Sequence, residues 1–147
     1  MALIDVVICE ESGDWSALLR RHLPAGAALI QTRHLDELWT CLREARRAVA
    51  AIELRVERGP EVLECLRRLD RQIPHAVPIV LAHRDVRDWE ELCREVGATA
   101  FILGLRSIGD VAEIVGGLVR SQTAWSKDTD EQMPLEDRIF ANLPWGH

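Results

Sequence analysis

The chain has 147 residues, of which 48% are hydrophobic and 29% are charged, a composition typical of a globular protein and not of a disordered one. Its net charge of −6 makes nucleic acid a poor partner, because neutralising phosphates requires a basic face. Its apolar runs are too short to span a bilayer, and no basic segment precedes the first one, so we expect a cytoplasmic protein without a membrane partner.

Short apolar runs alternate with helix-like patterns from the N-terminus to about residue 120. The runs are typical of strands covered on both faces, and they span residues 3–9, 27–32, 48–54, 77–82 and 100–103. Each run precedes a stretch with apolar residues at helical spacing, the fourth of which extends from Val86 to Val96. Right-handed crossovers between such strands predict an α/β fold, a doubly wound parallel sheet of five strands with helices on both faces.

Ligands of such sheets bind outside the carboxyl ends of the strands, so these ends are the places to look for chemistry. The candidate residues at the ends of the first, third, fourth and fifth strands are Glu10, Glu11, Glu53, Ala82, His83 and Gly104. A flavodoxin-like or dinucleotide-binding protein would need a phosphate-cradling loop after the first strand, but EESGDW is acidic and lacks GxGxxG. A hydrolase nucleophile elbow of the form GxSxG is also absent from the sequence.

Four segments resemble the receiver domains of two-component response regulators, and the likeness covers about residues 3–120. These segments are VVICEES, AAIELR, VPIVLAHRD and GATAFILGL. Receivers carry an acidic pair after the first strand and a phosphoacceptor Asp at the end of the third. They carry a Ser or Thr after the fourth strand and a Lys followed by Pro after the fifth. The resemblance implies the flavodoxin-like receiver topology and a place in a signalling phosphorelay.

The chain departs from the receiver pattern at several of these positions. Glu10 and Glu11 match the acidic pair, but Glu53 stands at the phosphoacceptor position. Ala82 has no hydroxyl and Gly104 has no side chain, so two stabilisers of a phosphoryl group are missing. Losing one such stabiliser costs about 10²–10³ in rate. We therefore expect no phosphoryl transfer at Glu53 and no enzymatic activity.

No other cation is expected to replace the missing lysine. The single lysine of the chain, Lys127, lies outside the receiver-like region, and Arg106 lies two positions past the expected site. Glu53 has two interpretations: its extra methylene moves the carboxylate toward the place of a phosphoryl group, as in a mimic of phosphorylation, or it is an inert relic.

Glu10, Glu11 and Glu53 form a predicted acidic pocket of three converging carboxylates without a nearby cation. Like charges this close either raise one pKa or recruit a divalent ion, so Mg²⁺ is a candidate cofactor with these three residues as ligands. The alternative is that the long glutamate side chains splay into solvent and bind no ion.

Phe101 falls where receivers place a switch aromatic that turns inward when the hydroxyl residue moves. Beside a residue as small as Ala82 its ring is expected to rest inward and to lock one state, unless it is an ordinary core residue. His83 lies near the same rim, and without an identified partner it is interpreted as a surface or capping residue.

The remaining sequence predicts a polar linker over residues 121–133 and a short amphipathic C-terminal segment over 134–147. The segment carries apolar residues largely on one side: Leu135, Ile139, Phe140, Leu143 and Trp145. A helix this short is marginal alone, so we expect it to dock either on a partner protein or on its own domain.

Taken together, these features predict a degenerate receiver domain, or pseudo-receiver, over residues 1–120 that signals by protein–protein interaction. Its expected partner is another signalling protein or a second copy of the chain. The alternative function is a response regulator that is weakly phosphorylated on Glu53 or another acid with Mg²⁺.

Overall fold

The computed structural model describes the backbone of residues 2–132 and the side chains of residues 2–122. Its strands are β1 (Ile4–Cys9), β2 (Ala27–Thr32), β3 (Ala48–Leu54), β4 (Ala76–Ala82) and β5 (Ala100–Leu103). Its α-helices are α1 (Asp14–Leu19), α2 (Leu35–Glu44), α3 (Gly59–Gln72), α4 (Glu90–Glu95) and α5 (Ile108–Gln132). Three short 3₁₀ turns, η1 (Val56–Arg58), η2 (Arg84–Trp89) and η3 (Leu105–Ser107), lead into α3, α4 and α5.

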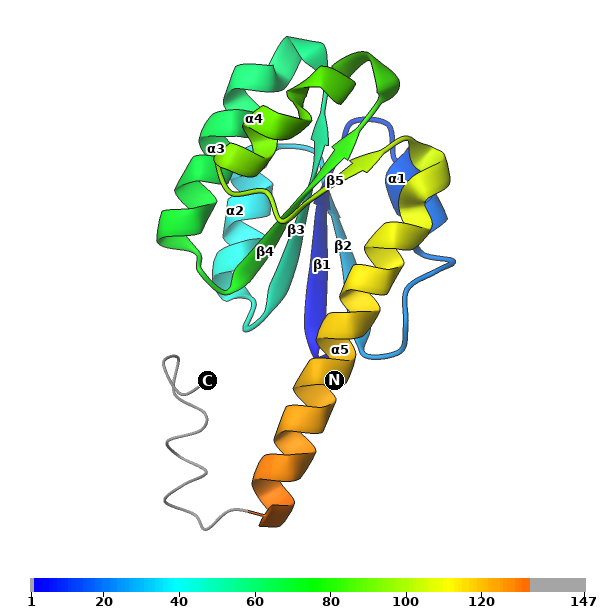
Figure 1. Cartoon of the computed structure of the whole chain (residues 1–147), viewed down its shortest axis with the longest axis vertical. Coiled ribbons are helices and arrows are strands. Elements are labelled where there is room, and N and C mark those ends of the chain that lie inside the picture. The colour runs from blue at the N-terminus through cyan, green and yellow to red at the C-terminus, as the bar shows by residue number, and fades with distance from the viewer. Residues whose placement is uncertain (1, 133–147) are drawn as a thin grey trace.

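The five strands form one parallel sheet in the order β2-β1-β3-β4-β5, with helices on both faces (Figure 1). This confirms the predicted doubly wound fold, and the strands begin and end within one residue of the predicted runs. The strands match because each is buried on both faces, which requires a continuous apolar run. In β3, for example, all seven residues are buried.

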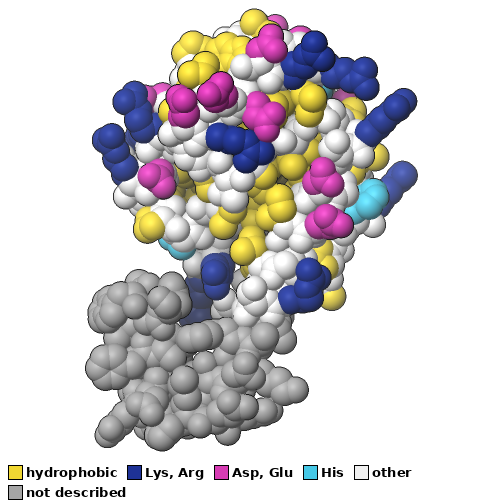
Figure 2. All heavy atoms as spheres, in the orientation of Figure 1, with side chains coloured by type: hydrophobic (Ala, Val, Ile, Leu, Met, Phe, Trp, Pro, Cys, Tyr) yellow, Lys and Arg dark blue, Asp and Glu magenta, His cyan; other side chains and the backbone are white. Residues whose placement is uncertain are grey.

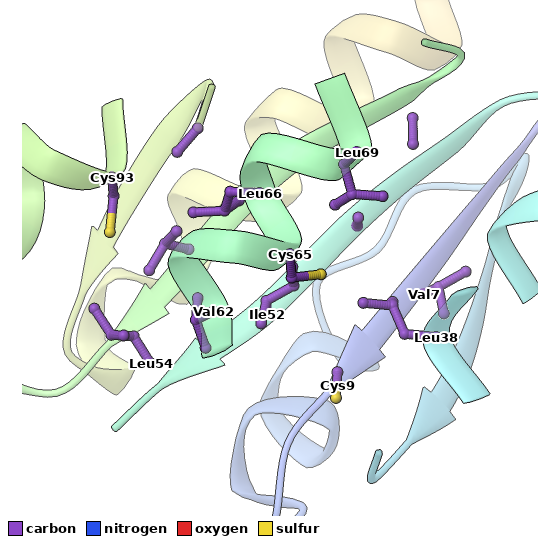
Figure 3. Close-up of a cluster of buried hydrophobic side chains, with 14 of the residues drawn as sticks. Val7, Cys9, Leu38, Ile52, Leu54, Val62, Cys65, Leu66, Leu69 and Cys93 are labelled. Carbon is purple, nitrogen blue, oxygen red and sulfur yellow. The ribbon is translucent and has the colours of Figure 1, made fainter. Parts of the chain in front are cut away.

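Alternate residues of the central strands enter two separate cores. Val7 of β1 and Ile52 of β3 point into the core beneath α2, α3 and α4, which Figure 3 shows with Cys65 and Leu66 of α3 packed against them. Val6 of β1 and its neighbours in β3 and β4 pack on the opposite face, against α1 and α5. The period of two along a strand produces this division.

The strand register brings the candidate residues to one edge of the sheet. Cys9, which precedes Glu10, pairs with Ile52, which precedes Glu53. Leu54 pairs with Ala82, and Ala82 pairs with Leu103, the residue before Gly104. The carboxyl ends of β1, β3, β4 and β5 therefore meet at the same edge, as the sequence predicts.

The helix predicted from Val86 to Val96 is wrong in part, because its first half is the 3₁₀ turn η2 with a break at Val86. The indole of Trp89 packs directly on Gly59 at the start of α3, where an added Cβ would lie 2.1 Å from the ring. Helical periodicity along one segment cannot reveal this contact, because the partner is more than two dozen residues away in sequence.

The segment predicted as a polar linker differs as well, because α5 continues through Gln132. Between residues 118 and 133 the sequence has no Gly or Pro, and the next proline after this stretch is Pro134. No helix-breaking residue therefore ends the helix at residue 120. The predicted domain boundary stays a prediction. The C-terminal segment 134–147, with its five proposed binding residues, lies outside the described residues. Within residues 2–132, no helix combines the length and the apolar character that a membrane span requires.

Candidate functional site

Glu53 lies next to the end of β3 with its side chain only 2% exposed. One carboxylate oxygen, Oε1, accepts hydrogen bonds from the backbone N–H of Glu11 at 3.2 Å and from Nε of Arg55 at 3.0 Å. The other, Oε2, accepts from Nε1 of Trp15 at 3.1 Å and from Nε2 of His83 at 2.9 Å. The carboxylate is therefore enclosed by donors from the ends of β1, β3 and β4 and from α1.

These donors change the acidity of Glu53. Burial, the largest single influence, raises the pKa of the carboxyl group, but the hydrogen bonds from His83, Arg55 and the Glu11 N–H, with the charge of Arg55, lower it. The net pKa lies below the ordinary value of 4.5, so Glu53 is ionised at neutral pH. The same pairing raises the pKa of Arg55, chiefly through its hydrogen bond to Glu53.

Glu10 is buried, and its carboxylate caps the start of α1. It accepts hydrogen bonds from the backbone N–H groups of Trp15 at 3.0 Å and Ser16 at 2.7 Å, and from the Ser16 hydroxyl. The first turn of a helix has backbone N–H groups with no partner inside the helix, and a nearby carboxylate satisfies them. Glu10 therefore has a structural task that engages both of its oxygens.

Glu11 lies at the rim, and its side chain is about half exposed. One oxygen lies 3.0 Å from the Arg58 guanidinium and the other lies 3.6 Å from Nε of Arg55. Arg55 therefore bridges the carboxylates of Glu11 and Glu53.

The predicted acidic pocket is wrong in two respects. Two arginines and His83 lie among the carboxylates, so the pocket is not free of cations, and the pKa of Glu53 is lowered instead of raised. Across the described part of the chain, no cluster of three or more His, Cys, Asp or Glu side chains is arranged to hold a metal ion.

The cavity beside these residues has a volume of about 20 Å³ and is lined by Glu10, Glu53, Arg55 and Arg58 among others. That volume accommodates about one water molecule.

Arg55 was missed by sequence reasoning, although a signal was present. Along an extended chain, side chains two residues apart point the same way, so the E-x-R pattern of residues 53–55 places the guanidinium beside the carboxylate. Arg55 itself is extended, with φ of −122° and ψ of 151°. His83 lies at the N-cap position of η2 with its side chain 35% exposed, in line with the predicted surface or capping residue, but it also has a partner that the sequence did not reveal. Its ring lies 5.6 Å from that of Trp15 and hydrogen-bonds Glu53.

Ala82 and Phe101 lie on the neighbouring strands β4 and β5, and both belong to the same hydrophobic core. Ala82 is fully buried at the end of β4, and Phe101 is 9% exposed in the cluster covered by α3 and α4. The aromatic ring is thus inward, as a core residue or an inward switch residue would be.

Gly104 follows β5 with φ of +83° and ψ of 152°, a backbone conformation that residues other than glycine rarely adopt. Its N–H donates to the Ala82 carbonyl at 2.7 Å, which joins the ends of β4 and β5. A lysine or any other side chain at this residue would strain the turn in this conformation. Arg106 is exposed in η3, and the guanidinium that contacts Glu53 is that of Arg55.

Comparisons with known proteins place the fold but not the family. No protein-family model and no curated protein matches the chain. Among solved structures, a response regulator from Thermotoga maritima is 20% identical with a TM-score of 0.62, over 82% of this chain and 99% of that one.

An atypical orphan response regulator, described as having a phosphorylation-independent regulatory mechanism, is 16% identical with a TM-score of 0.60, over 80% of this chain and 95% of the other. A chain described as an adenylate cyclase from Rhodopirellula baltica is 14% identical with a TM-score of 0.63, over 88% and 96%. Identities this low support a shared fold only. With its strand order and parallel sheet, the chain has the flavodoxin-like fold of receiver domains.

Proposed function

We propose that this chain is a receiver-like signalling module that acts by binding another protein and does not transfer phosphoryl groups. The observation that carries this proposal is the state of the Glu53 carboxylate: it is 2% exposed and surrounded by donors on both oxygens. A nucleophilic carboxylate must be accessible to a phosphodonor. It also needs nearby groups that stabilise the charge of the transferred phosphoryl group. Glu53 is covered, and Ala82 and Gly104 supply no such groups.

The contact between Glu53 and His83 supports the phosphorylation-mimic interpretation over that of a relic. His83 is the first residue after β4, so its bond of 2.9 Å connects the acid at the end of β3 to the loop that leads into η2 and α4. Trp89 anchors the other end of η2 on Gly59. The loop is thus held at both ends in one conformation, with Phe101 inward, and the surface formed by α4 and its neighbours is presented permanently.

That surface is the proposed binding face. In Figure 2 hydrophobic side chains gather between α4 and α5, over β5. The elements that border it carry two exposed leucines: Leu92 on α4, which is 48% exposed, and Leu103 at the end of β5, which is 38% exposed. A partner that covers them would be another signalling protein, with a second copy of this chain as the alternative.

The structural neighbour described as phosphorylation-independent is a precedent for such regulation in this fold. The neighbour described as an adenylate cyclase does not suggest an enzyme here, because a fold does not transmit an activity without the residues that perform it.

Phosphoryl transfer is tested by incubating the protein with acetyl phosphate and Mg²⁺ and measuring the intact mass. We expect no phosphoryl adduct, and an adduct that disappears in Glu53→Gln would establish the alternative, a weakly phosphorylated regulator.

The binding face is tested with Leu92→Asp and Leu103→Asp, using Leu3→Asp as the matched control because Leu3 is equally exposed at the far end of the sheet. Loss of a captured partner, or of self-association in sedimentation, is expected for the first two variants alone. Equal binding by all three variants would contradict the proposed face.

A further inference from the structure

Two arginines of the chain itself offset the charges of Glu53 and Glu11. Nε of Arg55 lies 3.0 Å from Glu53 and 3.6 Å from Glu11, and a nitrogen of Arg58 lies 3.0 Å from the other oxygen of Glu11. His83 reaches Glu53 from β4. In the receivers that the chain resembles, a divalent ion is expected among the corresponding acids.

The residues present do not fit such an ion. Both oxygens of Glu10 are occupied by the start of α1, and each oxygen of Glu53 already accepts from at least two donors. The adjacent cavity has a volume of about 20 Å³, close to that of one water molecule.

We infer that the Arg55 guanidinium replaces the divalent ion at this edge of the sheet, bridging Glu53 and Glu11 so that, together with Arg58, it offsets the charges of these two glutamates without Mg²⁺. A guanidinium held by its own chain cannot exchange with solvent, so the arrangement of the strand ends does not depend on the ion concentration. The raised pKa of Arg55 and the lowered pKa of Glu53 are consistent with a pair that stabilises both charges.

This inference goes beyond the proposed function, since it concerns the ion dependence of the pocket and holds whether or not a partner binds the face between α4 and α5. It also predicts that removing Arg55 creates a Mg²⁺ binding site. Removing the guanidinium leaves the carboxylates of Glu11 and Glu53 facing a vacated space, and two carboxylates with waters are a sufficient Mg²⁺ site.

The experiment measures the melting temperature of the wild type, Arg55→Ala and a control, Arg94→Ala, with and without 10 mM Mg²⁺. Arg94 forms an ion pair of 3.0 Å with Glu90 on α4, away from the pocket, so its loss removes one surface pair without creating a site. We expect no shift for the wild type or Arg94→Ala, and a rise of a few degrees for Arg55→Ala, from ligand binding to the folded state.

A second measurement covers the case in which Arg55→Ala does not fold: Arg55→Gln keeps most of the side-chain volume and is followed in the same way. In the wild type, Mn²⁺ should leave the Nε1–H resonance of Trp15, a neighbour of Glu53, unbroadened in NMR spectra. Stabilisation of the wild type by Mg²⁺, or broadening of that resonance by Mn²⁺, would overturn the inference. Variants of Arg55 that fold and remain indifferent to both ions would overturn it too, because the arginine would then not be what replaces the ion.

Discussion

Glu10 and Glu11 are neighbours that would act together in a metal site, whereas the structure assigns them different tasks. Replacing Glu10 with Ala removes the acceptor for two backbone N–H groups and one hydroxyl at the start of α1, all of them buried. Each buried donor without a partner costs about 1–3 kcal/mol. The Ser16 hydroxyl can rotate and water can enter, so we expect a loss of roughly 2–4 kcal/mol in the free energy of unfolding and a melting temperature lower by about 10 °C.

Glu11→Ala is the matched control. Its half-exposed carboxylate is paired with Arg55 and Arg58 at the surface, where ion pairs contribute about 0–1 kcal/mol. Urea unfolding followed by circular dichroism measures both variants against the wild type. Equal losses for the two variants, or a loss below about 1 kcal/mol for Glu10→Ala, would refute the assignment of Glu10 as the cap of α1.

Two further predictions concern Glu53 and Gly104. Because the pKa of Glu53 is lower in the folded state than its ordinary value of 4.5, the unfolded chain binds the extra proton first, so stability should fall as pH drops below 4.5. Urea unfolding at pH 3 to 7 should show that the free energy of unfolding decreases less toward acid pH in Glu53→Gln than in the wild type. The same pH dependence in both proteins would contradict the lowered pKa. Gly104→Ala should cost about 1 kcal/mol because of its positive φ, although a Cβ there meets no atom within 4 Å. Gly109→Ala, equally unobstructed but helical, should stabilise the protein by up to about 1 kcal/mol, and thermal melts that rank the two alike would count against backbone strain at Gly104.

The fold could be predicted from the sequence because its main signal, a continuous apolar run for each buried strand, can be read from the order of residues alone. A strand buried on both faces must be a continuous apolar run, and β3 shows this with seven buried residues in a row. The break in the fourth helix could not be predicted, because it accompanies a contact between Trp89 and Gly59 that depends on the packing of α3.

The candidate site was predictable in position but not in chemistry. Strand ends locate Glu10, Glu53 and Gly104, whereas the direction of each carboxylate depends on which donors reach it. Arg55 was within reach of sequence reasoning through the spacing of E-x-R, but the bond from His83 required knowing that β4 lies beside β3.

The length of α5 has a mechanical consequence. Figure 1 shows the helix continuing past the end of the sheet, and Gly116 is the last buried residue among its described side chains. At 1.5 Å per residue, the backbone between residues 119 and 132 forms a rod of about 20 Å. Such a rod transmits rotation as well as distance: each residue added to or removed from it turns whatever is attached by about 100°. The output of this module would then depend on helical phase, with seven-residue changes nearly preserving the direction in which the chain leaves it.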